Sequence, residues 1–300
     1  MPNTIAHLGL HALSTRAIFS KADIKWIYLG AILPDIPFVV KRAATFITPN
    51  ADILDVRLFA IVQASLLFTL VLAFACSRLS RRSTYVFLVL SFGILLHLLI
   101  DACQIKWGNG PRFLAPFDWS LTNFGFFWPE QLPSHLMTAI GGVYVIYAFT
   151  LPIREQAKDL ILPGPKGSLA LIASLAIYLF LPLAFLDAVE QAGGGSVQLI
   201  RMDERSGHEI ELDRARYRRD GARMTVEIFR GEFITLTGVD QDLPAAGKMS
   251  VRGTFSGNDA IRAHEFHIND ARYREQASML GLGIVALYWL IVLVSRFRET

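Results

Sequence analysis

The sequence predicts a mostly α-helical membrane protein: a polytopic bundle of about five spans, with a small all-β domain inserted before the last span. Three observations support this fold class. Hydrophobic residues make up 53% of the 300 residues and charged residues 18%, a composition more apolar than that of ordinary soluble domains. Five segments are long and apolar enough to span a bilayer. A polar, strand-like region separates the fourth of them from the fifth.

The N-terminal part of the chain carries polar residues in apolar surroundings. His7 and His11 in "HLGLH" are four residues apart, so both lie on one face of a helix. The segment 26–40 is too short to span, and Pro34 and Pro37 interrupt it around Asp35. We therefore expect a re-entrant or interfacial segment there. No apolar core with a small-residue cleavage site precedes it, so no cleaved signal peptide is expected.

The five predicted spans are at 58–77, 84–101, 133–151, 168–188 and 277–295. The connections 78–83 and 152–167 and the tail "RFRET" are rich in Lys and Arg, as cytoplasmic loops are. Residues 102–132 and 189–276 are then expected on the outer, non-cytoplasmic side of the membrane. This topology places Cys76 and Cys103 near opposite faces of the bilayer, so no disulfide is expected between them.

Three regions follow from this map. Residues 1–192 form a helical membrane domain, 193–275 an extracytoplasmic β domain, and 276–300 the final transmembrane helix with a cytoplasmic tail. The glycines of "EQAGGGSV" suggest a hinge before the β domain, and short strands are expected from "VQLIRM" at 197–202 onwards. The stretch 231–268 looks like an OB-type barrel. In the β domain, basic residues such as Arg214, Arg216, Arg218 and Arg219 alternate with few aromatics, so nucleic-acid binding is not expected, whereas a protein partner is possible.

The polar residues of the helical region suggest a binding site. His97 and Asp101 in "HLLID" repeat the four-residue spacing of His7 and His11. A carboxylate such as Asp35 in apolar surroundings needs a cation, a donor or a metal as its partner. Simpler interpretations remain open: the histidines can form ordinary hydrogen bonds, and Asp35 can cap a helix.

Lys106, Asn109 and Arg112 follow this cluster directly in "QIKWGNGPRF". Their positive charge and amide donors suit an anionic group such as a phosphate. Lys and Arg at the end of a span also serve as headgroup anchors, and that alternative stays open.

The order "H…H", "GAILPD" and "HLLID" resembles the bacterial membrane-bound metal-dependent hydrolase-like family of inner-membrane proteins, which is itself similar in motif to zinc-dependent phospholipase C. The resemblance covers roughly residues 1–150. It implies a divalent metal, with zinc expected, and these ligands: His7, His11, Asp35, His97 and Asp101. Where the family has a His-Ser pair, this chain has "VQASLL", and no His lies between Asp35 and His97. The candidate substitutes are Asp55, Gln63 and His135.

The function expected from these observations is metal-dependent hydrolysis of a phosphoester or lipid-linked substrate, with membrane lipid as the partner. Asp35 or Asp101 is the candidate general base if it does not bind the metal. The alternative is a non-catalytic integral membrane protein whose β domain binds a partner or an envelope component.

Overall fold

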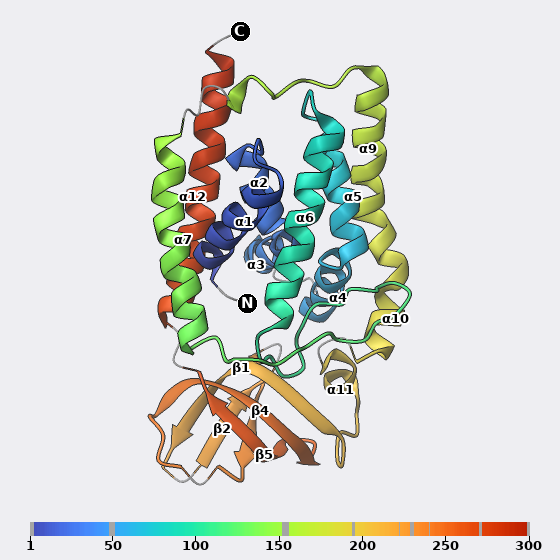
Figure 1. The fold of residues 1–300 in the computed structure, drawn as a ribbon. Helices are drawn as coiled ribbons and strands as arrows, with labels where there is room; N and C mark the ends of the chain where they lie inside the picture. Colours follow the sequence, from blue (N-terminus) through green and yellow to red (C-terminus); the bar gives the residue numbers. More distant parts are fainter. Residues whose placement is uncertain are drawn as a thin grey trace.

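The computed structural model describes residues 3–47, 52–151, 156–193, 196–221, 223–228, 231–239, 241–269 and 272–298. In it, a helical bundle stands on a β-barrel (Figure 1). Part of the basic connection 152–167 and two glycines of the predicted hinge, Gly194 and Gly195, lie outside these residues. The helices are α1 (Thr4–Ile18), α2 (Ile24–Ile32), η1 (Leu33–Asp35), α3 (Ile36–Ile47), α4 (Ile53–Gln63), α5 (Leu66–Ser77), α6 (Ser83–Ala102), α7 (Leu132–Thr150), α9 (Pro165–Phe180), η2 (Leu181–Phe185), α10 (Leu186–Gln191), α11 (Val197–Arg201) and α12 (Arg272–Phe297).

Four helical stretches of the described chain are long and apolar enough to cross a membrane: α6, α7, the run Pro165–Gln191 and α12. They confirm the helices predicted at 84–101, 133–151, 168–188 and 277–295. The predicted span 58–77 is not one straight helix, because α4 and α5 meet at 71°. Ser65 has extended backbone angles and begins α5 anew. The number of spans reaches five only if this bent pair counts as one.

The segment 26–40 is a pair of short helices, α2 and α3, joined by η1. Pro34 and Pro37 explain the break, since proline disrupts the hydrogen-bond ladder of a continuing helix. All residues of α2 except Leu29 and Ile32 are buried, and α2 packs against α1, α6 and α12. The expected re-entrant or interfacial segment is thus broken as predicted, but its first half lies in the interior of the bundle.

Glycines allow two close helix contacts that position the N-terminal helices. A Cβ on Gly93 of α6 would lie 3.2 Å from the backbone of Gly30 in α2. A Cβ on Gly141 of α7 would lie only 2.1 Å from the backbone oxygen of Ile5 in α1. Small residues let helix backbones approach closely within a membrane. These glycines let α2 pack closely against α6 and α1 against α7.

The β domain is a closed barrel with the strand order β1-β2-β3-β5-β4. Its strands are β1 (Glu209–Asp220), β2 (Arg223–Glu227), β3 (Phe233–Thr237), β4 (Ala246–Gly257) and β5 (Ala260–Ile268). All paired strands are antiparallel except β3 and β5. The strand predicted at 197–202 is wrong: these residues form α11, which buries Val197 and Ile200 three residues apart on one helical face.

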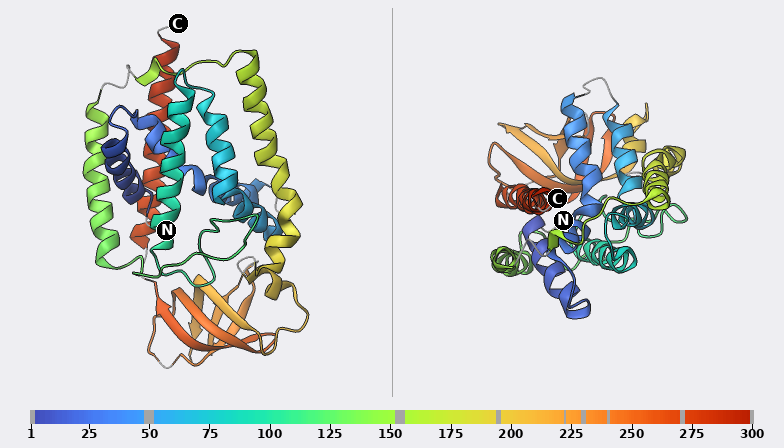
Figure 2. Two further views of the ribbon diagram at one scale, coloured as in Figure 1. Left: turned by 45° about the vertical axis from the view of Figure 1, so that its right-hand side comes forward. Right: turned by 90° about the horizontal axis from the view of Figure 1, so that it is seen from above.

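The barrel packs against the loop 103–131, which connects α6 to α7 and lies between the bundle and the barrel (Figure 2). The Gly108 N–H donates to the carboxylate of Glu211 in β1 at 2.5 Å. The ring of Trp128 stacks on His267 of β5 with centroids 3.7 Å apart. The barrel therefore contacts the same loop that carries Lys106, Asn109 and Arg112.

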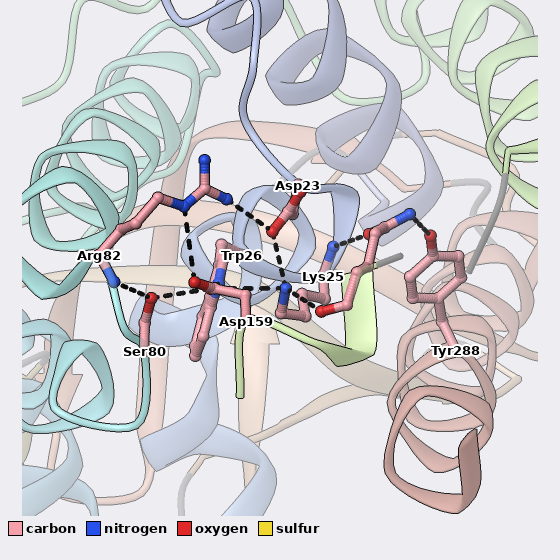
Figure 3. Close-up of polar contacts among 8 residues, drawn as sticks. Asp23, Lys25, Trp26, Ser80, Arg82, Asp159 and Tyr288 are labelled. Atoms are coloured by element: carbon pink, nitrogen blue, oxygen red, sulfur yellow. Dashed lines mark hydrogen bonds and ion pairs between the residues drawn. The ribbon is translucent and has the colours of Figure 1, made fainter. Parts of the chain in front are cut away.

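A largely buried polar network lies near the end of the bundle away from the barrel, where α6 begins (Figure 1), and Figure 3 shows its contacts. Its members are Asp23, Lys25, Trp26, Ser80, Arg82, Gln156, Asp159 and Tyr288. Asp159 accepts hydrogen bonds from Trp26 Nε1 at 2.9 Å and from Ser80 Oγ at 2.7 Å. Lys25 Nζ donates to the Gln156 carbonyl at 2.7 Å. These contacts tie α2 to the α5–α6 turn and to the connection after α7.

Candidate metal centre

His97 is held in a defined orientation by the helix contact beside it. Gly93 lies one turn before His97 on α6, and Gly30 directly precedes Ala31 on α2. The close approach of these glycines brings the Ala31 carbonyl 2.7 Å from His97 Nδ1. Because a carbonyl only accepts, Nδ1 carries the proton and the lone pair is on Nε2. A backbone carbonyl on the second ring nitrogen is a common support for a metal-binding histidine.

The α1 helix brings two further imidazoles to the same place. His7 and His11 are one turn apart and both are buried. The His7 ring stacks on the His97 ring with centroids 4.1 Å apart, and His11 lies 6.1 Å from His97. One ring nitrogen from each of the three histidines lies within 4.8 Å of the others. Among the described residues, this is the cluster that could hold a metal ion.

Two carboxylates border the histidines. Asp101 Oδ1 lies 3.4 Å from His7 Nε2, and its Oδ2 lies 3.9 Å from His97 Nε2. Asp35 Oδ1 is 3.6 Å from His97 Nε2. Asp35 reaches this point because η1 places it at the junction of α2 and α3. The structure thus brings together all five residues predicted as ligands.

The hydrogen bonding of this cluster leaves acceptors and donors unused. Within the described part of the chain, both ring nitrogens of His7, both of His11, and Oδ1 of Asp101 are buried without a hydrogen-bond partner. Buried polar atoms are normally satisfied. Of these five, His7 Nε2 and Asp101 Oδ1 face each other at 3.4 Å, whereas His7 Nδ1 and both ring nitrogens of His11 have no such neighbour and need an explanation. Imidazole nitrogens and carboxylate oxygens are the donor set that zinc prefers. The residues present therefore fit a divalent metal.

The centre opens into a cavity of about 150 Å³, which we call the site cavity. Asp35, His97 and Asp101 line it, as do the predicted residues Lys106, Asn109 and Arg112. It lies at the barrel end of α6, so the loop 103–131 forms part of its wall.

The three polar loop residues differ in their contacts. Lys106 Nζ forms an ion pair with Asp101 Oδ2 at 3.0 Å and is buried. Asn109 donates to Asp213 of the barrel at 3.3 Å. Arg112 is buried, and burial lowers the pKa of its guanidinium below the usual value, while Asp118 acts in the opposite direction. Arg112 is thus a buried cation at the wall of the site cavity, where an anionic group would stabilise its charge.

The candidate substitutes for the missing histidine lie elsewhere. Asp55 forms an ion pair with Arg201 at 2.6 Å. Gln63 Nε2 donates to the Tyr178 carbonyl at 3.1 Å. His135 Nε2 donates to the Glu130 carbonyl at 3.0 Å, and its ring stacks on Tyr273. None of the three is part of the histidine cluster in the described chain.

Sequence reasoning missed three contributors to this region. Arg57 of α4 lines the site cavity, and it directly precedes the apolar run that was predicted as a span at 58–77. Glu211 and Asp213 of β1 hold the loop of the cavity wall. Only the fold brings them close, because they are about a hundred residues from that loop.

The chain matches no family model, and no curated protein and no solved structure shows significant similarity to it. Function must therefore be argued from the geometry of the site.

Proposed function

We propose that the protein is a metal-dependent hydrolase of the bacterial inner membrane, acting on a phosphoester or lipid-linked substrate at the outer face. The observation that carries this proposal is a buried cluster of His7, His11 and His97 beside Asp35 and Asp101, in which the ring nitrogens of His7 and His11 have no hydrogen-bond partner. Three of these residues, Asp35, His97 and Asp101, line a cavity that basic residues also line. In the same topology the barrel is extracytoplasmic, and we interpret its five-stranded closed form as OB-like.

The three histidines serve as the metal-binding core. Three protein ligands and one open position are typical of catalytic zinc sites, so a fourth histidine is not required. Asp35, at the η1 break, lies beside this core with Oδ1 3.6 Å from His97 Nε2 and adds a carboxylate to the residues that would hold the metal. A bound divalent cation would acidify a water molecule and polarise a phosphoryl or acyl oxygen.

Asp101 is placed for a different task. Its Oδ2 is paired with Lys106, and its Oδ1 faces His7. The ion pair with Lys106 holds this carboxylate at the edge of the site cavity, where a general base would act. Arg112 supplies positive charge for the anionic part of the substrate, where a guanidinium can bind phosphate oxygens in pairs.

The test is metal content after purification in detergent. Wild-type protein should retain one zinc per chain. Loss of a residue that only hydrogen-bonds to a metal ligand typically lowers metal affinity about 10-fold to 100-fold. Loss of a ligand itself should cost at least as much, so we expect a decrease of that size or more for Asp35→Asn and for His97→Ala. His135→Ala is the matched control, because His135 lies outside the cluster and contacts Glu130 and Tyr273 instead.

His97→Ala also removes the hydrogen bond to Ala31, so a second variant separates binding from folding. His11→Asn removes an imidazole that has no hydrogen-bond partner among the described residues. It should lower metal content while the protein stays monodisperse. Unchanged metal in Asp35→Asn and His97→Ala would refute the proposal. Wild-type protein without metal would favour the non-catalytic alternative.

A further inference from the structure

A second cavity adjoins the metal centre on the side of the bundle. It has a volume of about 150 Å³ and lies between α3 and α12. Asp35 and Phe38 line both this cavity and the site cavity. The two cavities are therefore neighbours that share these two side chains of η1 and α3. We call the second one the side opening.

The lining of the side opening changes along α12. Arg274 and Glu275 line it near the barrel, Ser278 follows one turn later, and Met279 and Leu282 line it further into the span. At a rise of 1.5 Å per residue, Arg274 and Leu282 are about 12 Å apart along the helix. The lining therefore changes from charged to apolar along α12, as a membrane lipid changes from its charged headgroup to its apolar acyl chain.

Charge at the outer end of the opening favours an anion. Arg42 of α3 and Arg274 of α12 both line it. Glu275, the acidic residue of the α12 lining, is paired with Lys248 of the barrel. Beyond Asp35, the site cavity adds Lys106 and Arg112.

The apolar part of the opening faces outward from the bundle. Met279 is 65% exposed and Val39 is 42% exposed, and both line the opening. In a span, such exposed apolar side chains contact lipid tails rather than water. The opening therefore connects the region of the metal centre with the bilayer.

We propose that the side opening binds an anionic phospholipid, with the acyl chain between α3 and α12 and the phosphate directed to the basic residues around Asp35. This inference rests on the proposed function in naming that lipid as the substrate class, but the binding itself does not require hydrolysis. Lateral access would let the protein take its substrate without extracting the acyl chain into water, which costs about 0.8 kcal/mol per CH₂ group.

The test measures binding of phosphatidic acid labelled on its acyl chain to the full-length protein in detergent micelles. Ser278→Trp places a large ring inside the opening. Leu280→Trp is the matched control, because Leu280 lies two residues along α12, is 60% exposed and does not line the opening. Exclusion of even two methylene groups weakens binding by about tenfold or more, so this is the minimum loss expected for Ser278→Trp.

Wild-type protein and Leu280→Trp should bind labelled phosphatidic acid alike, and both should bind labelled phosphatidylcholine more weakly. Soluble glycerol phosphate should not displace the lipid, because it lacks the acyl chain. Equal binding by Ser278→Trp, or equal binding of the two lipids, would overturn the inference. Displacement by glycerol phosphate would assign the site to a free phosphate instead.

Metal content separates this inference from the proposed function. Ser278→Trp should retain the same zinc as wild type, which also shows that the bundle is intact. If wild type binds the anionic lipid as expected but holds no zinc, the hydrolase proposal fails and the lipid site stands. If wild type binds zinc but does not prefer the anionic lipid, the inference about the lipid fails and the hydrolase proposal stands.

Discussion

Replacement of Gly141 by alanine should damage the metal centre from a distance. The new Cβ would lie 2.1 Å from the Ile5 backbone oxygen, whereas ordinary contact begins at about 3.4 Å. Since the obstacle is backbone, no side-chain rotation relieves it. The α1 helix must move away from α7 by about 1.3 Å to restore ordinary contact. Such overpacking typically costs about 1–3 kcal/mol.

The neighbouring glycine provides the matched control. A Cβ on Gly142 meets nothing within 4 Å. Both substitutions gain the higher helix propensity of alanine, about 1 kcal/mol relative to glycine. The difference between Gly141→Ala and Gly142→Ala therefore isolates the helix contact, and we expect about 1–3 kcal/mol in the free energy of unfolding.

Metal binding should respond as well, because α1 carries His7 and His11. Ligand distances in metal sites are fixed to within about 0.2 Å, so a shift of α1 of the expected size separates these imidazoles from His97. Thermal unfolding in detergent, with and without added zinc, together with zinc content, measures both effects. If Gly141→Ala matches Gly142→Ala in stability and zinc, the α1–α7 contact does not position the site.

Two further predictions concern the two ends of the bundle. Burial acts to raise the pKa of Asp159, but hydrogen bonds from Trp26 and Ser80 and the nearby cations Lys25 and Arg82 hold it below its usual value of 3.8. The ionised Asp159 therefore stabilises the protein above pH 3.8, and this stabilisation is lost as the pH falls further. In Asp159→Asn, the free energy of unfolding measured with urea should decrease less between neutral and acidic pH than in wild type. An equal decrease in the two proteins would contradict this prediction. Residues 196–272 expressed alone should give a soluble, β-rich fold by circular dichroism, because the barrel closes on its own core; an aggregated product under several conditions would show that the bundle completes it.

Composition predicted the four long apolar helices, and spacing predicted which polar residues share a helix face. Apolar length marks a span wherever it lies in the chain, and four-residue spacing places His7 with His11 and His97 with Asp101 on any helix. The bend between α4 and α5 could not be predicted in this way, because the run 58–77 is apolar throughout. Hydrophobicity does not distinguish a straight span from a bent one.

The contacts that orient the centre were not accessible to sequence reasoning. The Ala31 carbonyl that fixes His97 belongs to the backbone, so no residue type signals it. Gly9 and Gly141 meet across more than a hundred positions, and neither stands in a recognisable motif. In 197–202, alternating apolar residues suggested a strand, but a three-residue spacing of Val197 and Ile200 suited a short helix equally well.

The contact between α1 and α7 also sets an order on biosynthesis. The ribosome makes α1 before α7, and α1 has only 15 residues, two of them histidines. It is too short to insert as a span by itself. Its partners His97 and Gly141 lie on α6 and α7, which the ribosome makes later. The histidine cluster can therefore form only after α6 has been made, and α1 reaches its final place against Gly141 only after α7 has followed.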